Sequence, residues 1–140
     1  MASVFIQEIA QLVLDAQLAA VPPITSCWAL KVNESDDHLD REVILYSTGG
    51  LAAIRVQEEK GAKYVQQLAQ VRVRALDQLE AAERAQALWR QVFNGQVRNR
   101  YVLDTYYLGV DVEQPVYFLG RDDSDRYLFG FNIRALKEPS

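Results

Sequence analysis

The sequence contains a single cysteine, Cys27, and a single histidine, His38. One cysteine cannot form an internal disulfide, and in a strand-like stretch it is typical of a small buried residue. One histidine excludes a metal site built from several histidines. Catalysis by a Cys-His pair would require Cys27 and His38 to meet in space, which leaves an enzyme that uses these two residues as one alternative.

The sequence motifs of common enzyme and cofactor sites are also missing. The chain has no C-x-x-C, no H-E-x-x-H pair and no G-x-S-x-G turn, and no lysine stands directly before a helix as in a phosphate-binding loop. We therefore predict that the protein is not an enzyme and uses no cofactor and no metal.

Long apolar stretches and an excess of positive charge are lacking as well. No run approaches the roughly 20 apolar residues of a membrane helix. The start of the chain lacks the basic residues of a signal peptide, so a cytoplasmic protein is expected. The 15 Lys and Arg are outnumbered by 19 Asp and Glu, giving a net charge of −4. This charge disfavours direct binding to nucleic acid, because nucleic-acid-binding proteins usually have a basic face.

What remains is an ordinary globular composition, with 49% hydrophobic and 24% charged residues. A chain of 140 residues suits a single domain over 1–140. Apolar residues recur at helical spacing from about Val4 to Ala20 and predict a helix there. Alternating patterns predict a strand over Ile24–Val32, and then a hairpin of Glu42–Thr48 and Leu51–Gln57 with Gly49-Gly50 as its turn.

The middle of the chain, Lys60–Asn94, is rich in residues that favour helices. We predict a short helix over Ala62–Gln70 and a longer one over Leu76–Phe93, with a break near the alternating Val71–Arg74. One side of the longer helix would carry the apolar residues Leu76, Leu79, Ala82 or Ala85, Trp89 and Phe93.

The last third is rich in aromatic and β-branched residues, which suit strands. Three consecutive strands are predicted, at Tyr101–Val110, Pro115–Gly120 and Arg126–Ala135. The predicted fold class is therefore α+β: a mainly antiparallel sheet of about six strands packed against an N-terminal helix and a long central helix.

Two acidic segments are candidate docking sites for a basic partner, because complementary charge steers association. The first contains Glu34, Asp36, Asp37, Asp40 and Glu42. The second contains Asp122, Asp123 and Asp125. The alternatives are a solvated loop for the first and an ordinary turn for the second. A calcium site is not indicated, because the glycine and distal glutamate of an EF-hand loop do not follow the second segment.

Tyrosines and arginines offer other surfaces. Tyrosine is favoured at interfaces because it combines a large contact area with a polar tip. Strand alternation places some of the tyrosines in the core, so they cannot form one patch: Tyr101, Tyr106, Tyr107, Tyr117 and Tyr127. The arginines are more typical of a charged helix face than of a phosphate site: Arg72, Arg74, Arg84, Arg90, Arg98 and Arg100.

The C-terminal third resembles the nuclease A inhibitor family. The likeness lies in Tyr107-Leu108-Gly109, the acidic spacer Asp111–Glu113, Val116–Gly120 and Leu128–Phe131 with its short tail. That family consists of small acidic α/β proteins that block a sugar-non-specific, metal-dependent endonuclease. The resemblance implies that carboxylates and the C-terminus at Ser140 approach the basic cleft of such a nuclease.

We therefore predict a non-enzymatic, acidic protein-binding module whose partner is a basic protein. The most specific version of this prediction is an inhibitor of a sugar-non-specific nuclease. The predicted partner-binding residues are Glu34, Asp36, Asp37, Asp122, Asp123, Asp125 and Ser140. The alternative is a structural or assembly subunit that associates through exposed tyrosine-rich strands. A second alternative is an enzyme that uses Cys27 and His38.

Overall fold

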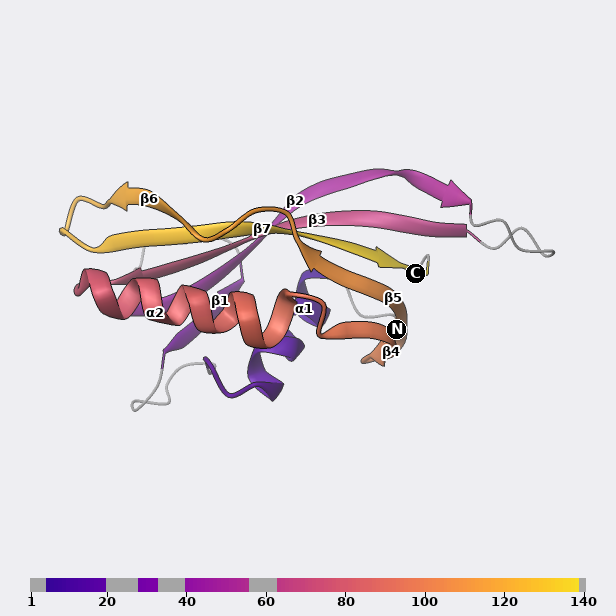
Figure 1. Cartoon of the computed structure of the whole chain (residues 1–140), viewed down its shortest axis with the longest axis horizontal. Helices are drawn as coiled ribbons and strands as arrows, with labels where there is room; N and C mark the ends of the chain where they lie inside the picture. Colours follow the sequence, from indigo (N-terminus) through magenta and orange to yellow (C-terminus); the bar gives the residue numbers. More distant parts are fainter. Residues whose placement is uncertain (1–4, 20–27, 33–39, 56–62, 139–140) are drawn as a thin grey trace.

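The computed structural model describes residues 5–19, 28–32, 40–55 and 63–138. Two helical segments and seven strands follow one another along these residues (Figure 1). Their order is α1 (Phe5–Asp15), β1 (Ala29–Val32), β2 (Arg41–Arg55), β3 (Lys63–Ala75), α2 (Gln78–Leu88) with the π-helical turn η1 (Trp89–Phe93), β4 (Val97–Val102), β5 (Thr105–Val112), β6 (Tyr117–Arg121) and β7 (Tyr127–Lys137).

The strands form one sheet in the order β1-β2-β3-β7-β5-β4, and β6 pairs with the first part of β7. β5 pairs with the last part of the same strand, from Ile133 to Lys137. β1 and β2 run parallel, and the other neighbours run antiparallel. The sheet curls into a half-barrel, and both α1 and α2 lie on one side of it (Figure 1). No helix among the described segments combines the length and the hydropathy that crossing a membrane would take.

The predicted fold class is wrong, because the described residues are mostly sheet and include no long central helix packed on it. Residues 63–75, where we predicted the short helix Ala62–Gln70 and a break, form the strand β3. The alternation of Val71–Arg74 is the strand pattern itself rather than a helix break. Val71 and Val73 are fully buried on one face, and burial of that alternating face outweighs the helix propensity of the surrounding Gln and Ala residues.

Two predicted turns are also displaced. β2 continues through Gly49-Gly50 as far as Arg55, and its pairing with β3 shifts register between Ser47 and Gly49. The glycines therefore lie at an irregularity within a strand, which is another common place for glycine in a sheet. The predicted strand Tyr101–Val110 is instead a hairpin, because Leu103 and Asp104 turn β4 back into β5.

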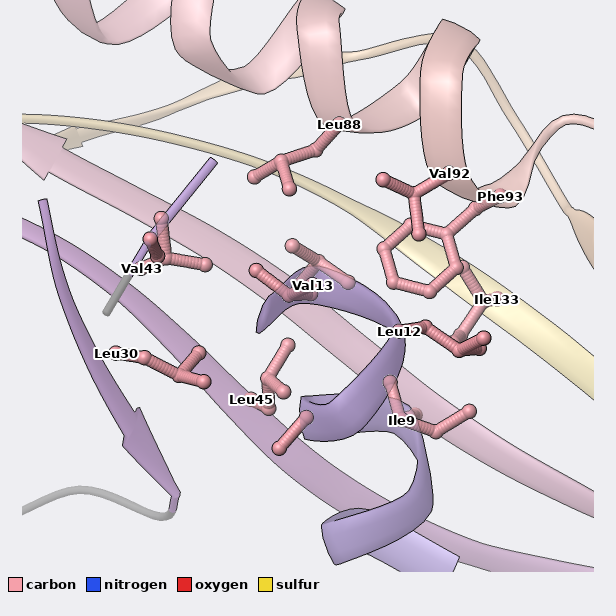
Figure 2. Close-up of a cluster of buried hydrophobic side chains, with 14 of the residues drawn as sticks. Ile9, Leu12, Val13, Leu30, Val43, Leu45, Leu88, Val92, Phe93 and Ile133 are labelled. Carbon is pink, nitrogen blue, oxygen red and sulfur yellow. The ribbon is translucent and has the colours of Figure 1, made fainter. Parts of the chain in front are cut away.

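The hydrophobic core lies between the helices and one face of the sheet. Figure 2 shows side chains of α1 and of α2 with η1 directed into the same cluster as side chains from β1, β2 and β7. The labelled residues are Ile9, Leu12, Val13, Leu30, Val43, Leu45, Leu88, Val92, Phe93 and Ile133. The ring of Phe93 packs 5.9 Å from that of Phe131, centroid to centroid. This burial of apolar surface is the main term that holds the helices on the sheet.

A buried polar cluster joins α1 to the start of β5 and the end of β7. The carboxylate of Glu8 is fully buried and accepts hydrogen bonds from the hydroxyls of Tyr107, at 2.7 Å, and Thr105. The Nζ atom of Lys137 lies 3.7 Å from Oε1 of Glu8 and 5.5 Å from the centroid of the Phe5 ring. Because Phe5 and Glu8 are one helical turn apart, both reach Lys137 from the same side of α1.

We expect Glu8→Ala to lower the free energy of unfolding by about 3–5 kcal/mol, because it leaves the buried ammonium of Lys137 and two hydroxyls without this carboxylate. Urea unfolding at neutral pH measures the loss. The control is Gln7→Ala, which removes an exposed side chain from the adjacent position of α1. A loss for Glu8→Ala as small as that of the control would contradict this account of the cluster.

Candidate assembly surfaces

Six charged side chains gather where β1, β2 and β3 meet the turn between β6 and β7. We call them the charge cluster: Lys31, Asp40, Glu42, Arg74, Asp122 and Arg126. Glu42 is fully buried, with its carboxylate oxygens 3.5 Å from Nζ of Lys31 and 3.3 Å from Nη1 of Arg74. The cluster contains three acidic and three basic side chains, and its buried members Glu42 and Arg74 are paired, as burial of charge requires.

Asp122 links the two acidic segments of the sequence through arginines. Its Oδ2 lies 3.4 Å from Nε of Arg74 and 3.2 Å from Nη1 of Arg126, and Nε of Arg126 lies 3.0 Å from Oδ1 of Asp40. The backbone N–H groups of Ser124 and Arg126 donate to Oδ1 of Asp122. Burial raises the pKa of Asp122, but the hydrogen bonds from Arg126 and Ser124 outweigh it and hold the pKa below its ordinary value of 3.8.

The predicted partner-binding residues fall into two groups. Glu34, Asp36, Asp37 and Ser140 lie outside the described residues, as do Cys27 and His38. The second group lies on the turn between β6 and β7, where Asp125 pairs with Arg121 at 3.3 Å and Asp123 is exposed. Because Asp122 is paired with two arginines, this turn does not present three uncompensated carboxylates. Within the described parts of the chain, no three His, Cys, Asp or Glu residues gather as metal ligands.

The tyrosines differ widely in exposure. Tyr107 is fully buried, and its burial together with the nearby Glu8 carboxylate raises its pKa, so its hydroxyl stays a hydrogen-bond donor. The hydroxyl of Tyr117 accepts a hydrogen bond from Gln70, and Arg121 lies over the ring of Tyr127. Tyr101 is 63% exposed and packs edge-on against Tyr106, with 5.3 Å between the ring centroids. Of the five tyrosines named in the sequence analysis, the strongly exposed one is Tyr101, on the β4–β5 hairpin.

The arginines singled out in the sequence do not form one basic patch. Arg72 lies over the ring of Tyr46, and Arg84 lies over that of Trp28. Arg98 pairs with Asp111 at 2.6 Å, and Arg74 belongs to the charge cluster. Most of them are therefore engaged in contacts within the chain.

Large exposed apolar side chains gather in two places of the described residues, and of these side chains the sequence analysis named only Tyr101 as a surface residue. The tip of the β4–β5 hairpin presents Tyr101 and Leu103, and the start of α2 presents Leu76 and Leu79. The predicted buried side of this helix is wrong in part, because Ala81, Ala85 and Leu88 face the core while both leucines are exposed. The signal was in the sequence: Ala81, Ala85 and Leu88 also follow helical spacing, and small alanines suit a helix packed closely on a sheet.

The exposed side of α2 also carries a shallow depression of about 430 Å³. Its described lining comes from one stripe of the helix: Leu79, Ala82, Glu83, Gln86 and Arg90. Leu79, Glu83, Gln86 and Arg90 are three or four residues apart, and Ala82 precedes Glu83, which places all five on one side of the helix. Together, the hairpin tip and this depression are the candidate assembly surfaces.

A family model described as "Bacteriophage tail terminator protein" matches residues 12–139. No curated protein matches the chain. Among solved structures, a chain of the structure titled "Virion of native gene transfer agent (GTA) particle" has a similar fold, with a TM-score of 0.61 and 11% sequence identity. The similarity covers 98% of this chain and 100% of that one. At this identity the likeness shows a shared fold.

The resemblance to nuclease A inhibitors is wrong, because the family match over 12–139 is to tail terminators. The segments on which the resemblance rested, such as Val116–Gly120, are common β-strand sequences and occur in unrelated sheets. The predicted partner, a basic nuclease, rested on this resemblance and is therefore wrong as well. The alternative of a structural or assembly subunit is the better supported of the sequence predictions.

We expect Asp122→Asn to destabilise the protein by about 1–2 kcal/mol at pH 7, because charged hydrogen bonds to two arginines are lost. The folded-state pKa of Asp122 lies below 3.8, so its carboxylate stabilises the fold fully above about pH 4. That contribution disappears as the pH falls through the lowered pKa. Thermal unfolding of both proteins at pH 7 and near pH 3 should therefore show a difference that shrinks in acid.

The matched control is Asp123→Asn, because Asp123 is exposed on the same turn. It should leave stability unchanged at both pH values. A destabilisation by Asp122→Asn that is the same at pH 3 as at pH 7 would show that the charge of Asp122 is not the cause.

Proposed function

The chain belongs to the bacteriophage tail terminator family, and on this premise we propose that it is a structural subunit of a phage-type particle. Its function is to bind other protein subunits of that particle rather than to catalyse a reaction. The observation that carries this proposal is the family match, which spans residues 12–139. We propose the cytoplasm as the place where the chain folds before assembly.

The geometry of the described residues supports an assembly role. The charge cluster pairs its acidic side chains with basic ones within the chain. The cluster therefore does not present an acidic surface to a basic partner. The exposed apolar side chains of the hairpin tip and of α2 are the kind of surface that contacts other proteins. The similarity to a chain of a gene transfer agent virion adds a fold that is compatible with this role.

We expect the chain to co-sediment with phage-type particles when these are purified from its native source. Density-gradient fractions can be probed with an antibody against the chain, and a particle coat protein serves as the positive control. Deletion of the gene should leave particles with defective tails, because a missing structural subunit is not replaced. Recovery of the chain only in particle-free fractions, together with normal particles in the deletion strain, would contradict the proposal.

A further inference from the structure

We infer that Asn94 is a site of spontaneous covalent modification, in which the backbone nitrogen of Gly95 attacks the side-chain amide of Asn94 and ammonia is released. The modification turns residue 94 into aspartate or isoaspartate and adds a negative charge to the chain. This inference concerns the link between η1 and β4 and does not depend on the proposed structural role.

The chemistry uses the atoms of Asn94 and Gly95 together with water. Water or hydroxide takes the proton of the Gly95 N–H group, and the nitrogen then bonds to Cγ of Asn94. The bond from Cγ to Nδ2 breaks, Nδ2 takes up a proton from water and leaves as ammonia, and a cyclic imide remains. Water opens this ring. Attack at Cγ gives aspartate, whereas attack at the backbone carbonyl gives isoaspartate, in which the main chain runs through Cβ and Cγ.

The position of Asn94 in the sequence and on the surface favours this reaction. Asn94 is the one asparagine of the sequence that a glycine follows, whereas arginine follows Asn99 and isoleucine follows Asn132. Glycine has no side chain to hinder the approach of its nitrogen to Cγ. Both Asn94 and Gly95 are exposed, and they lie between η1 and β4 rather than inside either element. Water therefore reaches both the amide that is lost and the nitrogen that attacks.

The N–H group of Gly95 belongs to a tight turn rather than to a helix or a sheet. Asn94 has a φ of −86° and a ψ of 77°, and the N–H group of Gly95 donates to the carbonyl of Phe93 at 3.0 Å. This is the pattern of an inverse γ-turn. Ring closure requires the peptide between Asn94 and Gly95 to rotate out of the turn. Gly95 allows the rotation, because it stands at a φ of +75° and tolerates other values as well.

Asn132 provides the contrast within the same chain. It is partly buried in β7, and its N–H group donates to Oε1 of Gln114 at 3.1 Å while its carbonyl accepts from the N–H group of Glu113 at 2.9 Å. The nitrogen that would have to attack its side chain belongs to Ile133, which is fully buried and paired with Val112 in the sheet. We therefore expect Asn132 to remain unmodified in the folded protein.

The guanidinium group of Arg98 lies beside Gly95 and assists the reaction. Its Nη2 atom is 3.8 Å from the point where a Cβ atom of Gly95 would stand. An ion pair with Asp111 at 2.6 Å and a hydrogen bond from Nη1 to the carbonyl of Val97 hold the group there. Negative charge develops on the Gly95 nitrogen as its proton leaves, and a nearby positive charge stabilises it. Asp111 offsets part of this effect, so the assistance is modest.

Modification weakens the link in which it occurs. Phe93 and Val97 are buried on either side of the link, so the chain between them is fixed at both ends. Isoaspartate inserts an extra carbon atom into this short span of main chain. A carboxylate at position 94 also stands at the C-terminal end of η1, where the N–H group of Asn94 donates to the carbonyl of Trp89 at 2.9 Å. The dipole of a helix disfavours negative charge at that end.

Incubation of the purified chain in mildly alkaline buffer tests the site. Trypsin places the two asparagines in separate peptides, Asn94 in residues 91–98 and Asn132 in residues 127–134. Mass spectrometry should show that NH2 is replaced by OH at Asn94 to an extent that grows with time, with aspartate and isoaspartate forms that separate by chromatography. The peptide of Asn132 should not change, and Asn94→Ser should abolish the reaction.

A sample digested without prior incubation measures the reaction that occurs during digestion itself. An Asn94 peptide that changes no faster than the Asn132 peptide would overturn the inference. That outcome would leave the proposed structural role standing, because the two rest on different observations.

Variants of Arg98 test the electrostatic assistance. Arg98→Met removes the charge and should slow the reaction at Asn94 by about twofold or more, whereas Arg98→Lys keeps the charge and should restore most of the rate. Arg121→Met, which removes the same charge from β6, is the control and should leave the rate unchanged. In concentrated urea the fold no longer holds residue 98 beside Gly95, so the rates of all these proteins should converge. A folded Arg98→Met chain that reacts as fast as the wild type would overturn the role of Arg98.

Discussion

The fold depends on β3 being paired along both of its edges. β2 and β7 flank this strand, and its register with β7 is unbroken from Val65 to Ala75. Its inner face carries Ala69, Val71, Val73 and Ala75, all fully buried. The small residues on this face match Ala81 and Ala85 of α2, so helix and sheet can approach closely. The outer face carries Arg74, whose charge is matched by Glu42 and Asp122. A one-residue slip of β3 would move the valines off the core face and break the ion pairs of Arg74, which fixes the register of β3.

This same strand marks the limit of what the sequence predicts. The aromatic runs of β5, β6 and β7 are strand-like by composition alone, whereas β3 is built from Gln, Ala and Arg, which favour helices when considered in isolation. Only its alternation reveals a strand, and the alternation is most distinct over the four residues Val71–Arg74. Tertiary pairing decided the outcome, because the two neighbouring strands satisfy both edges of β3. Local propensity contains no information about such neighbours.

The candidate surfaces escaped prediction for related reasons. A turn formed by Leu103 and Asp104 has neither glycine nor proline, so the run from Tyr101 to Val110 has the pattern of one strand. Leu76 and Leu79 have helical spacing and were therefore placed on the apolar side of the helix, although Ala81 and Ala85 are the residues that are buried. In both places the residues with the largest apolar side chains are exposed. Hydrophobic patterning alone assigns such residues to the interior, so surfaces used for binding are where it fails.

Part of the acidic charge that is prominent in the sequence is paired within the described residues, at Asp40 and Asp122. Asp40 and Asp122 lie far apart along the chain, yet Arg126 contacts both. These ion pairs connect the turn between β6 and β7 to the start of β2 and thereby position that turn. Strain and apolar exposure at Leu103 have no such internal compensation among the contacts of the described residues. A feature that costs the isolated fold free energy and stabilises nothing within it is better evidence for a binding surface than a feature whose charges are already paired.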